Sequence, residues 1–220
     1  MSSGEQQREG ILVRPELRLS EQQIRLIDGM SRELLHDPGL FCYNAEAADV
    51  FQKAGATVKE EKNCVRLRIP DTVLDKALQS APSRIVLGAR DPKNQLILDA
   101  HEPRVRFVSG SETNIWLDVQ FENGVPRFNR QPGSIERLRR AAHLCENLEH
   151  LDAFIRCVNI RDEAVNKSNK DVNKFFVSLN TISKHVMAGL TNIHALDDVM
   201  RLGQIITGGE EAFEKNPVLS

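Results

Sequence analysis

The sequence has few large aromatic residues and no long apolar run. Tryptophan and tyrosine occur once each, as Trp116 and Tyr43. No uninterrupted apolar stretch approaches the roughly 18 residues that a membrane-spanning helix needs. The first ten residues, MSSGEQQREG, lack the apolar segment of a secretory signal. We therefore expect a soluble, cytoplasmic protein with no membrane partner.

The sequence also lacks an excess of charge of one sign and a set of paired cysteines. The formal net charge is −2 over 220 residues, so no overall basic field would attract a nucleic acid. The four cysteines stand alone without a C-x-x-C pair, which argues against a disulfide framework. The histidines show no ligand spacing with one another or with cysteine. The sequence therefore predicts neither a metal site nor a nucleic-acid partner.

What is present is the composition of a globular protein, 40% hydrophobic and 27% charged. Residues 1–19 are polar, and we expect them to form a disordered tail. Residues 20–83 predict a helical segment, in which Asn44 caps an amphipathic helix that Gly55 ends.

Residues 84–133 have the pattern of short strands. In RIVLGARDPKNQLILDA, two apolar runs flank a Pro-Lys-Asn turn, which predicts a hairpin. RVRFVSG, TNIWLDV and GVPRFNR continue in strand-like pieces, so we predict a β subdomain of roughly five strands. The VSGSETN loop does not precede a helix and lacks G-x-G-x-x-G, which argues against a phosphate cradle. Its Glu112 is either a turn residue or a residue that approaches a binding site.

Residues 134–220 alternate helices with apolar strands, namely AFIRCV, HVMAGL and PVL. The helix predicted at 170–182 points Phe175 and Phe176 inward. This alternation predicts βαβ units and a parallel sheet, so the fold class is α/β. A complete (β/α)₈ barrel takes about 250 residues. We therefore expect the first βα units of a truncated TIM barrel that stops at Ser220, although three strands could also form a small open sheet.

Six stretches in colinear order resemble a known family. They are LLHDPGLFCYNAEAADVFQKAGATV, VRLRIPDTVLDKALQSAPSRIVLGARDP, VRFVSGSETNIWLDV, SIERLRRAAHLCENLEHLDAF, SKHV and ITGGEEAFEKNPVLS. Their order and spacing are similar to the N-terminal region of the trimethylamine:corrinoid methyltransferase (MttB-type) family, from about residue 17 to the end. No single motif is diagnostic, and the colinear set carries the resemblance.

The resemblance implies a TIM barrel preceded by a helical and β segment, in a chain much longer than this one. It implies methyl transfer from a methylated amine to the cobalt of a separate corrinoid protein, so the corrinoid (cobalamin) is supplied by that partner and this chain binds no cofactor. The amine would be trimethylamine or a quaternary amine such as glycine betaine. Members that use trimethylamine carry pyrrolysine in their second half, which lies outside this sequence. We expect a homo-oligomer at full length and little activity from this fragment alone.

Candidate site residues follow from the rule that barrel active sites lie at the C-terminal ends of the strands. AFIRCV ends at Val158, so Asn159, Arg161 and Asp162 fall on the next loop. The family has a similar Arg-Asp pair, which makes Arg161 and Asp162 the leading candidates. The carboxylate would attract an ammonium and the guanidinium would hold a substrate carboxylate. The alternative is an exposed ion pair worth under about 1 kcal/mol.

The HVMAGL strand supplies three further candidates. Met187 and Gly189 lie toward its functional end, although Met187 also suits a packing role. His185 lies near the start of the strand, where residues are more often structural. If the strand begins earlier, His185 could point inward. Aromatic faces typically hold quaternary ammonium groups, and Trp116 is better placed to pack in the β segment than to join such a cage.

Two other functional classes remain open. The chain could be a non-catalytic binding or scaffold module, which predicts a stable and monodisperse protein. It could also belong to a different TIM-barrel enzyme that shares only the N-terminal layout. A truncated enzyme predicts aggregation instead, because apolar edges would be left uncovered.

Overall fold

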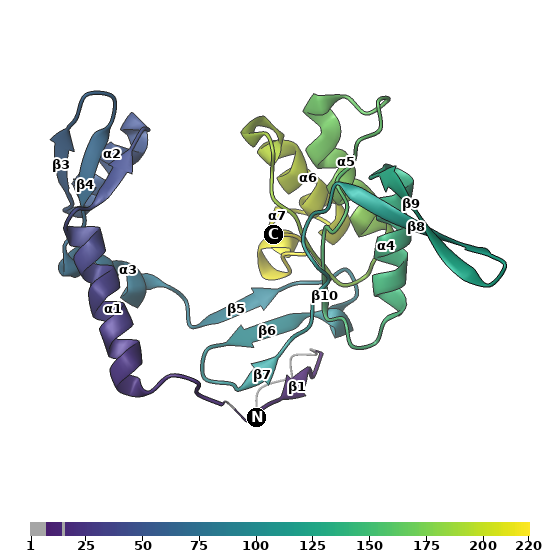
Figure 1. Ribbon diagram of the computed structural model, residues 1–220, viewed down its shortest axis with the longest axis horizontal. Helices are drawn as coiled ribbons and strands as arrows, with labels where there is room; N and C mark the ends of the chain where they lie inside the picture. The colour runs from purple at the N-terminus through teal and green to yellow at the C-terminus, as the bar shows by residue number, and fades with distance from the viewer. Residues whose placement is uncertain (1–7, 15) are drawn as a thin grey trace. The chain divides into compact units, whose positions relative to one another are not determined.

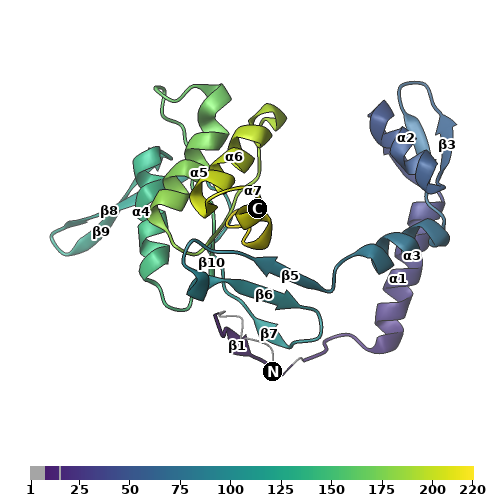
Figure 2. The same ribbon diagram turned by 180° about the vertical axis from the view of Figure 1, so that it is seen from behind.

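The computed structural model describes residues 8–14 and 16–220 and divides the chain into two compact units. One unit is Arg14–Ser83. The other joins the start of the chain, up to Val13, to Arg84–Ser220. Figures 1 and 2 show the two units from opposite sides.

The unit Arg14–Ser83 combines three helices with a small antiparallel sheet of order β2-β4-β3. The predicted helix forms as α2, because the Asn44 side chain accepts the Ala47 amide at 2.9 Å and Gly55 adopts φ +106° at its end. All three strands of the sheet are short, with three or four residues each. The elements are α1 (Glu21–His36), β2 (Leu40–Cys42), α2 (Ala45–Ala54), β3 (Thr57–Glu60), β4 (Val65–Arg68) and α3 (Asp71–Ser80).

An ion pair joins helix α1 to helix α3 in this unit. Helix α1 has no buried residue, and the buried core consists of Ala48, Ala56, Leu67 and Ile69. Arg32 of α1 instead reaches Asp75 of α3 at 2.8 Å and Asp28 of its own helix at 2.9 Å. Ion pairs on a partly exposed surface contribute little individually, so this unit depends on a network of them.

The second unit begins with antiparallel strand pairs. Three pairs form: β1 with β7, β5 with β6, and β8 with β9 (Figure 1). The bounds are β1 (Ile11–Leu12), β5 (Arg84–Leu87), β6 (Leu96–Asp99), β7 (Arg104–Val105), β8 (Ile115–Glu122) and β9 (Val125–Pro132). The hairpin predicted around the Pro-Lys-Asn turn is confirmed as β5–β6.

Two sequence predictions need correction here. The expected disordered tail is wrong at Ile11–Leu12, which pair with Arg104–Val105; residues 1–7 and 15 of that tail lie outside the described residues. The expected β subdomain has its five strands, but they form separate pairs and belong to one compact unit with the helices that follow. Sequence pattern locates strands better than it assigns their partners, because pairing depends on distant segments.

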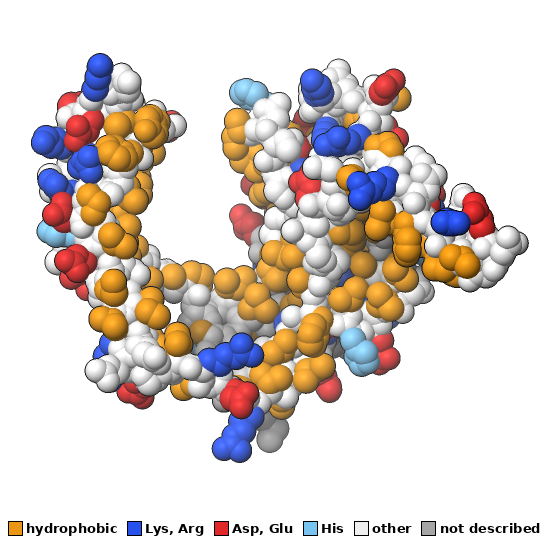
Figure 3. All heavy atoms as spheres, in the orientation of Figure 1, with side chains coloured by type: hydrophobic (Ala, Val, Ile, Leu, Met, Phe, Trp, Pro, Cys, Tyr) orange, Lys and Arg blue, Asp and Glu red, His pale blue; other side chains and the backbone are white. Residues whose placement is uncertain are grey.

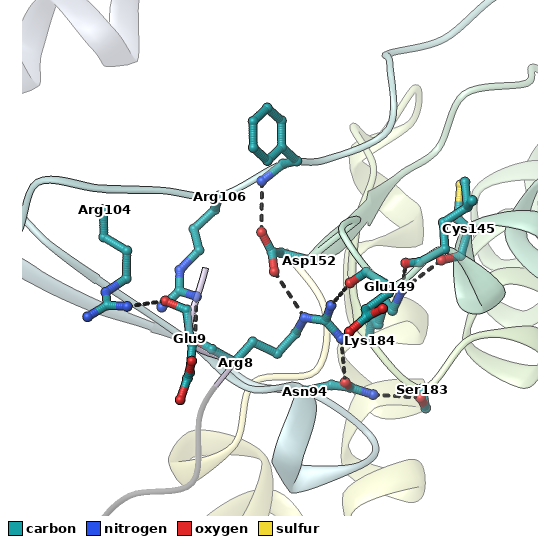
Figure 4. Close-up of polar contacts among 12 residues, drawn as sticks. Arg8, Glu9, Asn94, Arg104, Arg106, Cys145, Glu149, Asp152, Ser183 and Lys184 are labelled. Carbon is teal, nitrogen blue, oxygen red and sulfur yellow. Dashed lines mark hydrogen bonds and ion pairs between the residues drawn. The ribbon is translucent and has the colours of Figure 1, made fainter. Parts of the chain in front are cut away.

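The N-terminal arm, residues 8–13, is fastened to this unit by Arg8 (Figure 4). Its guanidinium donates to Asp152 at 3.0 Å, to Asn94 at 3.0 Å and to the Glu149 carbonyl. Asp152 also accepts the Phe107 amide at 2.8 Å. A single arginine therefore holds the arm, the turn before β6 and the residue just before strand β10 (Ala153–Ile155) in one place.

The sheet at the centre of this unit is parallel. Strand β10 pairs in parallel with β11 (His185–Met187), from Ala153↔His185 to Ile155↔Met187. Parallel bridges at Val108↔Ala153, Thr113↔Val158 and Val186↔Leu219 add an extended segment on each side. The α/β class and the parallel pairing are thus confirmed. The segment 108–113 was predicted partly as the strand-like piece RVRFVSG and partly as the VSGSETN loop, whose Gly and Ser residues are typical of a turn. Its parallel pairing with β10 was not predicted.

Helices cover this parallel sheet and form the core with it. They are α4 (Ile135–Asn147), α5 (Lys170–Thr181), α6 (Leu196–Thr207) and α7 (Glu210–Lys215). Phe175 is buried in this core as predicted, but Phe176 is 52% exposed. The buried side of α5 is turned toward Lys174 and Phe175, which are 1% and 2% exposed, so Phe176 lies at its edge. Other buried core residues are Leu138, Ala142, Phe154, Val158, Leu179, Ile182, Val186 and Val218.

Asn216 lies close to the backbone of Gly88, and a substitution at Gly88 tests the importance of this contact. Asn216 pairs with the Ala89 amide and carbonyl, both at 3.0 Å, and a Cβ on Gly88 would lie 2.3 Å from the Asn216 Oδ1. We expect Gly88→Ala to lower the free energy of unfolding by about 1–3 kcal/mol, measured by urea titration. Gly110→Ala, where a Cβ meets nothing within 4 Å, is the control. Equal stability of the two variants would contradict the expectation.

Candidate functional site

Four charged side chains meet at the carboxyl ends of the parallel segments. We call them the carboxyl-end cluster: Glu112, Arg156, Asp171 and Lys174. Glu112 belongs to the segment 108–113, Arg156 directly follows β10, and the other two lie in the first turns of α5. In parallel α/β folds, ligands bind at this end of the strands.

Arg156 and Glu112 form the more open pair of the cluster. An Arg156 Nη2 pairs with the Glu112 carboxylate, while the Arg156 amide donates to the Met187 carbonyl at 2.9 Å. The Arg156 side chain is only 5% exposed, whereas that of Glu112 is 36% exposed. The hydrogen bond from Arg156 lowers the pKa of Glu112 below its ordinary value, so this carboxylate carries its negative charge at neutral pH.

Asp171 and Lys174 form the buried pair. Their charged atoms lie 2.6 Å apart, and the side chains are 2% and 1% exposed. Asp171 also accepts the amides of Thr191 and Asn192 at 2.9 Å, while the Lys174 ammonium donates to the Gly189 carbonyl. This pair ties α5 to the loop that follows β11.

The same hydrogen bonds control the pKa values of the buried pair. Burial alone would raise the pKa of Asp171, but the bonds from Lys174 and Thr191 outweigh it and lower that pKa. Burial lowers the pKa of Lys174, opposed by its hydrogen bond with Asp171. Several hydrogen-bond donors hold Asp171 in its charged form. The Asp171–Lys174 pair therefore stays charged, although an isolated charge buried at this position would be neutralised.

Two buried polar atoms beside this cluster have no hydrogen-bond partner among the described residues. They are Arg156 Nε, a donor, and Asn159 Oδ1, an acceptor. Asn159 otherwise donates from its side chain to Asn114 at 3.1 Å and from its amide to the Thr113 carbonyl at 2.9 Å. Buried polar atoms are nearly always paired, so a water, a ligand or further protein can supply these partners.

The two leading sequence candidates take other positions. The Asp162 carboxylate accepts the Ile135 amide at 2.8 Å and so serves the first turn of α4. Arg161 is exposed, and its amide donates to the Gly133 carbonyl at 3.0 Å. No ion pair joins Arg161 and Asp162 within the described part of the chain. The geometry gives Asp162 a capping role and does not bring Arg161 into the carboxyl-end cluster.

The candidates on β11 divide between its two ends. Met187 and Gly189 lie at the carboxyl end, where each contributes a backbone carbonyl, to Arg156 and to Lys174 respectively. His185 lies at the opposite end and is completely buried. Its ring nitrogens lie 2.8 Å from the Gly88 carbonyl and 2.9 Å from the Ser220 hydroxyl. His185 is therefore a hydrogen-bonded core histidine in this structure.

Acid should weaken the fold through His185. Burial lowers the pKa of His185 below its ordinary value, an effect that its backbone hydrogen bond to Gly88 partly opposes. The unfolded chain then binds the extra proton first, so stability falls below about pH 6.5 by up to about 1.4 kcal/mol per pH unit. We expect His185→Gln to reduce the difference in unfolding free energy between pH 7.5 and 5.5, by urea titration. The exposed His194→Gln variant should keep that difference.

Sequence reasoning missed Arg156, Asp171 and Lys174. One signal for Arg156 was available, since it is the only charge in the apolar strand AFIRCV. A charge inside an apolar strand is costly unless it is paired. Asp171 and Lys174 resemble an ordinary i, i+3 surface pair on a helix, so nothing in the sequence distinguishes them.

Within residues 8–14 and 16–220, no group of three or more His, Cys, Asp and Glu side chains is placed to hold a metal ion. Across the same residues, no helix combines the length and apolarity required to cross a membrane.

Comparison with known proteins identifies the family. The model of the trimethylamine methyltransferase (MTTB) family matches residues 7–220. The chain belongs to the trimethylamine methyltransferase family. A trimethylamine methyltransferase MttB of Desulfitobacterium hafniense is 28% identical over 201 residues, which is 91% of this chain and 38% of that protein. MttB1 of Methanosarcina mazei is 30% identical over 208 residues, covering 90% and 39%.

This membership confirms the resemblance in the sequence. MttB of Methanosarcina thermophila is likewise 30% identical over 211 residues, covering 91% of this chain. The chain spans about two fifths of the length of these relatives. The matches therefore show the family of the chain. They also cover the part of the fold that contains the carboxyl-end cluster.

Proposed function

We propose that the complete protein transfers a methyl group from a methylated amine to the cobalt of a corrinoid protein. The amine is trimethylamine or a quaternary amine such as glycine betaine. Family membership over residues 7–220 is the observation that carries this proposal. The relatives are named trimethylamine methyltransferases, and the acceptor and the range of amines are the proposed extension.

The proposal includes a (β/α)₈ barrel whose first strands are in this chain. Its support is the parallel order of the segment 108–113, β10, β11 and the bridge at Leu219, with helices α5 and α6 between strands. Each crossover through a helix adds the next parallel strand, as in a barrel. The carboxyl-end cluster would then lie at the mouth, where barrel enzymes have their active sites.

Glu112 is the residue of the cluster best placed to meet a cationic substrate. It is negatively charged and more exposed than the other cluster carboxylate, Asp171. An ammonium attracted to Glu112 would be oriented by the fixed neighbours Arg156 and Asn159, whose unpaired atoms could bond a polar substituent. Arg156 is also suited to a substrate carboxylate, because guanidinium groups bind carboxylates through two parallel bonds.

The chain's contribution is to bind and orient the amine. The corrinoid held by the partner supplies the strong cobalt nucleophile that accepts the methyl group. The N–CH₃ bond breaks and its electron pair stays on the nitrogen, so a quaternary ammonium, or trimethylamine bound as its protonated ammonium, departs with a neutral nitrogen and takes no proton from the enzyme. Positioning and charge placement are therefore the required protein functions, and no general acid is needed.

A methylation assay tests this proposal directly. The complete protein is mixed with its corrinoid protein in the reduced cobalt state, and each candidate amine is added while the cobalt spectrum is followed. We expect a Co–CH₃ product with at least one methylated amine. If trimethylamine, glycine betaine and other methylated amines all leave the spectrum unchanged, the proposed activity is wrong and a binding or scaffold role gains support.

A further inference from the structure

The β8–β9 ribbon, residues 115–132, is the least covered part of the second unit. It is a two-stranded antiparallel hairpin closed by Asn123 and Gly124, whose φ angles of 51° and 80° suit a type I′ turn. The ribbon projects from its unit in both views (Figures 1 and 2). Within the described residues, its strands pair only with each other. Isolated two-stranded ribbons are marginal in water, so this one needs further support.

One face of the ribbon is almost entirely apolar. Residues directly opposite in an antiparallel pair point to the same side, so alternate positions define this face. Its large side chains are between 47% and 72% exposed. Figure 3 shows hydrophobic side chains on the projecting ribbon. The apolar face comprises Ile115, Leu117, Val119, Phe121, Pro126, Phe128 and Pro132, with Arg130 as its one charge.

The opposite face holds the base of the ribbon against α4. Trp116 donates from its indole to Asp118 at 2.8 Å, and Asp118 pairs with Arg137 of α4 at 3.3 Å. The Arg140 guanidinium lies 5.5 Å from the centre of the Trp116 ring. Because this face contacts α4, the apolar face is directed away from that helix. The ribbon is thus anchored in a fixed orientation with its apolar side uncovered.

The exposed area is large for a surface without a partner. Seven apolar side chains at about half exposure present roughly 400–500 Å², comparable with the largest patch of a typical monomer, about 300–600 Å², which is often functional. Two such faces packed together would bury about 1,000 Å² in total, the minimum for a specific interface. An identical second face therefore supplies enough area for association.

The charges of the ribbon favour another copy over a charged partner. Asp118 and Glu122 balance Arg127 and Arg130, so the ribbon has no net charge. Glu122 and Arg127 already pair at 3.3 Å across the strands. A neutral surface gives a nucleic acid or a strongly charged protein no electrostatic attraction, whereas two neutral copies meet without repulsion.

We propose that the apolar face of the β8–β9 ribbon is a homodimer interface, on which two copies pack their ribbons face to face about a two-fold axis. Such an isologous contact needs only a self-complementary patch. Pairing by strand edges is less suitable, because Pro126 and Pro132 lack the amide donors that the β9 edge would need. Edge pairing would also leave both apolar faces in water.

Analytical ultracentrifugation of Phe121→Asp tests this interface. Phe121 is 72% exposed near the tip of the ribbon, so its replacement removes little internal packing. Gln120→Asp adds the same charge to the opposite face one residue away. For the complete protein, we expect a dimer in the wild type and in Gln120→Asp. The dissociation constant of Phe121→Asp should rise about 100-fold or more, since each dimer loses two buried phenylalanines.

Several outcomes overturn the proposal. They are a monomeric wild type, equal weakening by both substitutions, and a Phe121→Asp dimer of wild-type affinity. Loss of corrinoid-protein binding by a Phe121→Asp protein that is monomeric like the wild type would assign the face to that partner instead. Thermal melting of each variant verifies that it is folded. The ultracentrifugation uses no substrate, so a failure of the dimer proposal can be distinguished from a failure of the methylation assay.

Discussion

Asp171→Ala should be the most destabilising single substitution in the buried part of the carboxyl-end cluster. It leaves the Lys174 ammonium, 1% exposed, without its charge partner and leaves the Thr191 and Asn192 amides without their acceptor. Removing one member of a buried ion pair costs about 3–5 kcal/mol, because the remaining charge stays desolvated. We expect a loss of this size in the free energy of unfolding, measured by urea titration at pH 7.

Two further variants separate charge from packing. Lys174→Met in the Asp171→Ala background removes the stranded charge, so the double variant should be more stable than Asp171→Ala alone. Glu211→Ala removes an exposed ion pair with Lys215, at 2.7 Å, and should cost under about 1 kcal/mol. If Asp171→Ala costs no more than Glu211→Ala, the buried pair does not stabilise the fold as argued.

The fold was predictable from sequence where the signal is local. Asn44 marks the start of α2 by side-chain capping, and Gly55 marks its end by a positive φ angle. Neither signal needs a distant partner. The alternation of strands and helices after residue 134 predicts parallel β10–β11 pairing because a helical crossover requires it. These features depend on the residues of their own segment.

Pairing between distant segments was not predictable in the same way. Ile11–Leu12 form a strand by pairing with Arg104–Val105, and the apolar run Ile11-Leu12-Val13 is too short to predict that pairing. The segment 108–113 resembles a turn by composition but lies parallel to β10. Tertiary context overrides local preference at such positions. Because its segment resembles a turn, Glu112 was predicted to be either a turn residue or a residue that approaches a binding site.

The sequence placed candidate residues at the end of the sheet where the carboxyl-end cluster lies, but Glu112 is the one cluster side chain among them. The loop after β10 was expected to contribute Arg161 and Asp162, yet the cluster takes Arg156 from the strand end itself. Asp162 is used to cap α4, a role set by where Ile135 happens to lie. A carboxylate in a loop has many possible partners, and only the three-dimensional neighbours decide between them.

In the proposed methyl transfer, Glu112→Gln in the complete protein should raise KM for the methylated amine about tenfold or more while leaving kcat within a few-fold of the wild type. One lost contact between a partly buried carboxylate and an ammonium is worth about 1.4 kcal/mol, or a factor of ten. The nitrogen loses its positive charge as the methyl group departs, so the contact is stronger in the ground state than in the transition state. Such an interaction affects binding more than the chemical step.

The matched control for Glu112 is Glu163→Gln, an exposed carboxylate on the loop between β10 and α5. It removes the same charge from the same end of the sheet, so a general loss of negative potential would raise KM equally in both variants. A specific contact at Glu112 raises KM in that variant alone. If Glu112→Gln instead lowers kcat with KM unchanged, the carboxylate acts in the chemical step, and its role as a ground-state binding group is wrong.

Because the Arg156 hydrogen bond keeps the pKa of Glu112 low, the KM of the wild type should also stay constant down to pH values below the ordinary glutamate pKa of about 4.3, wherever the enzyme remains folded.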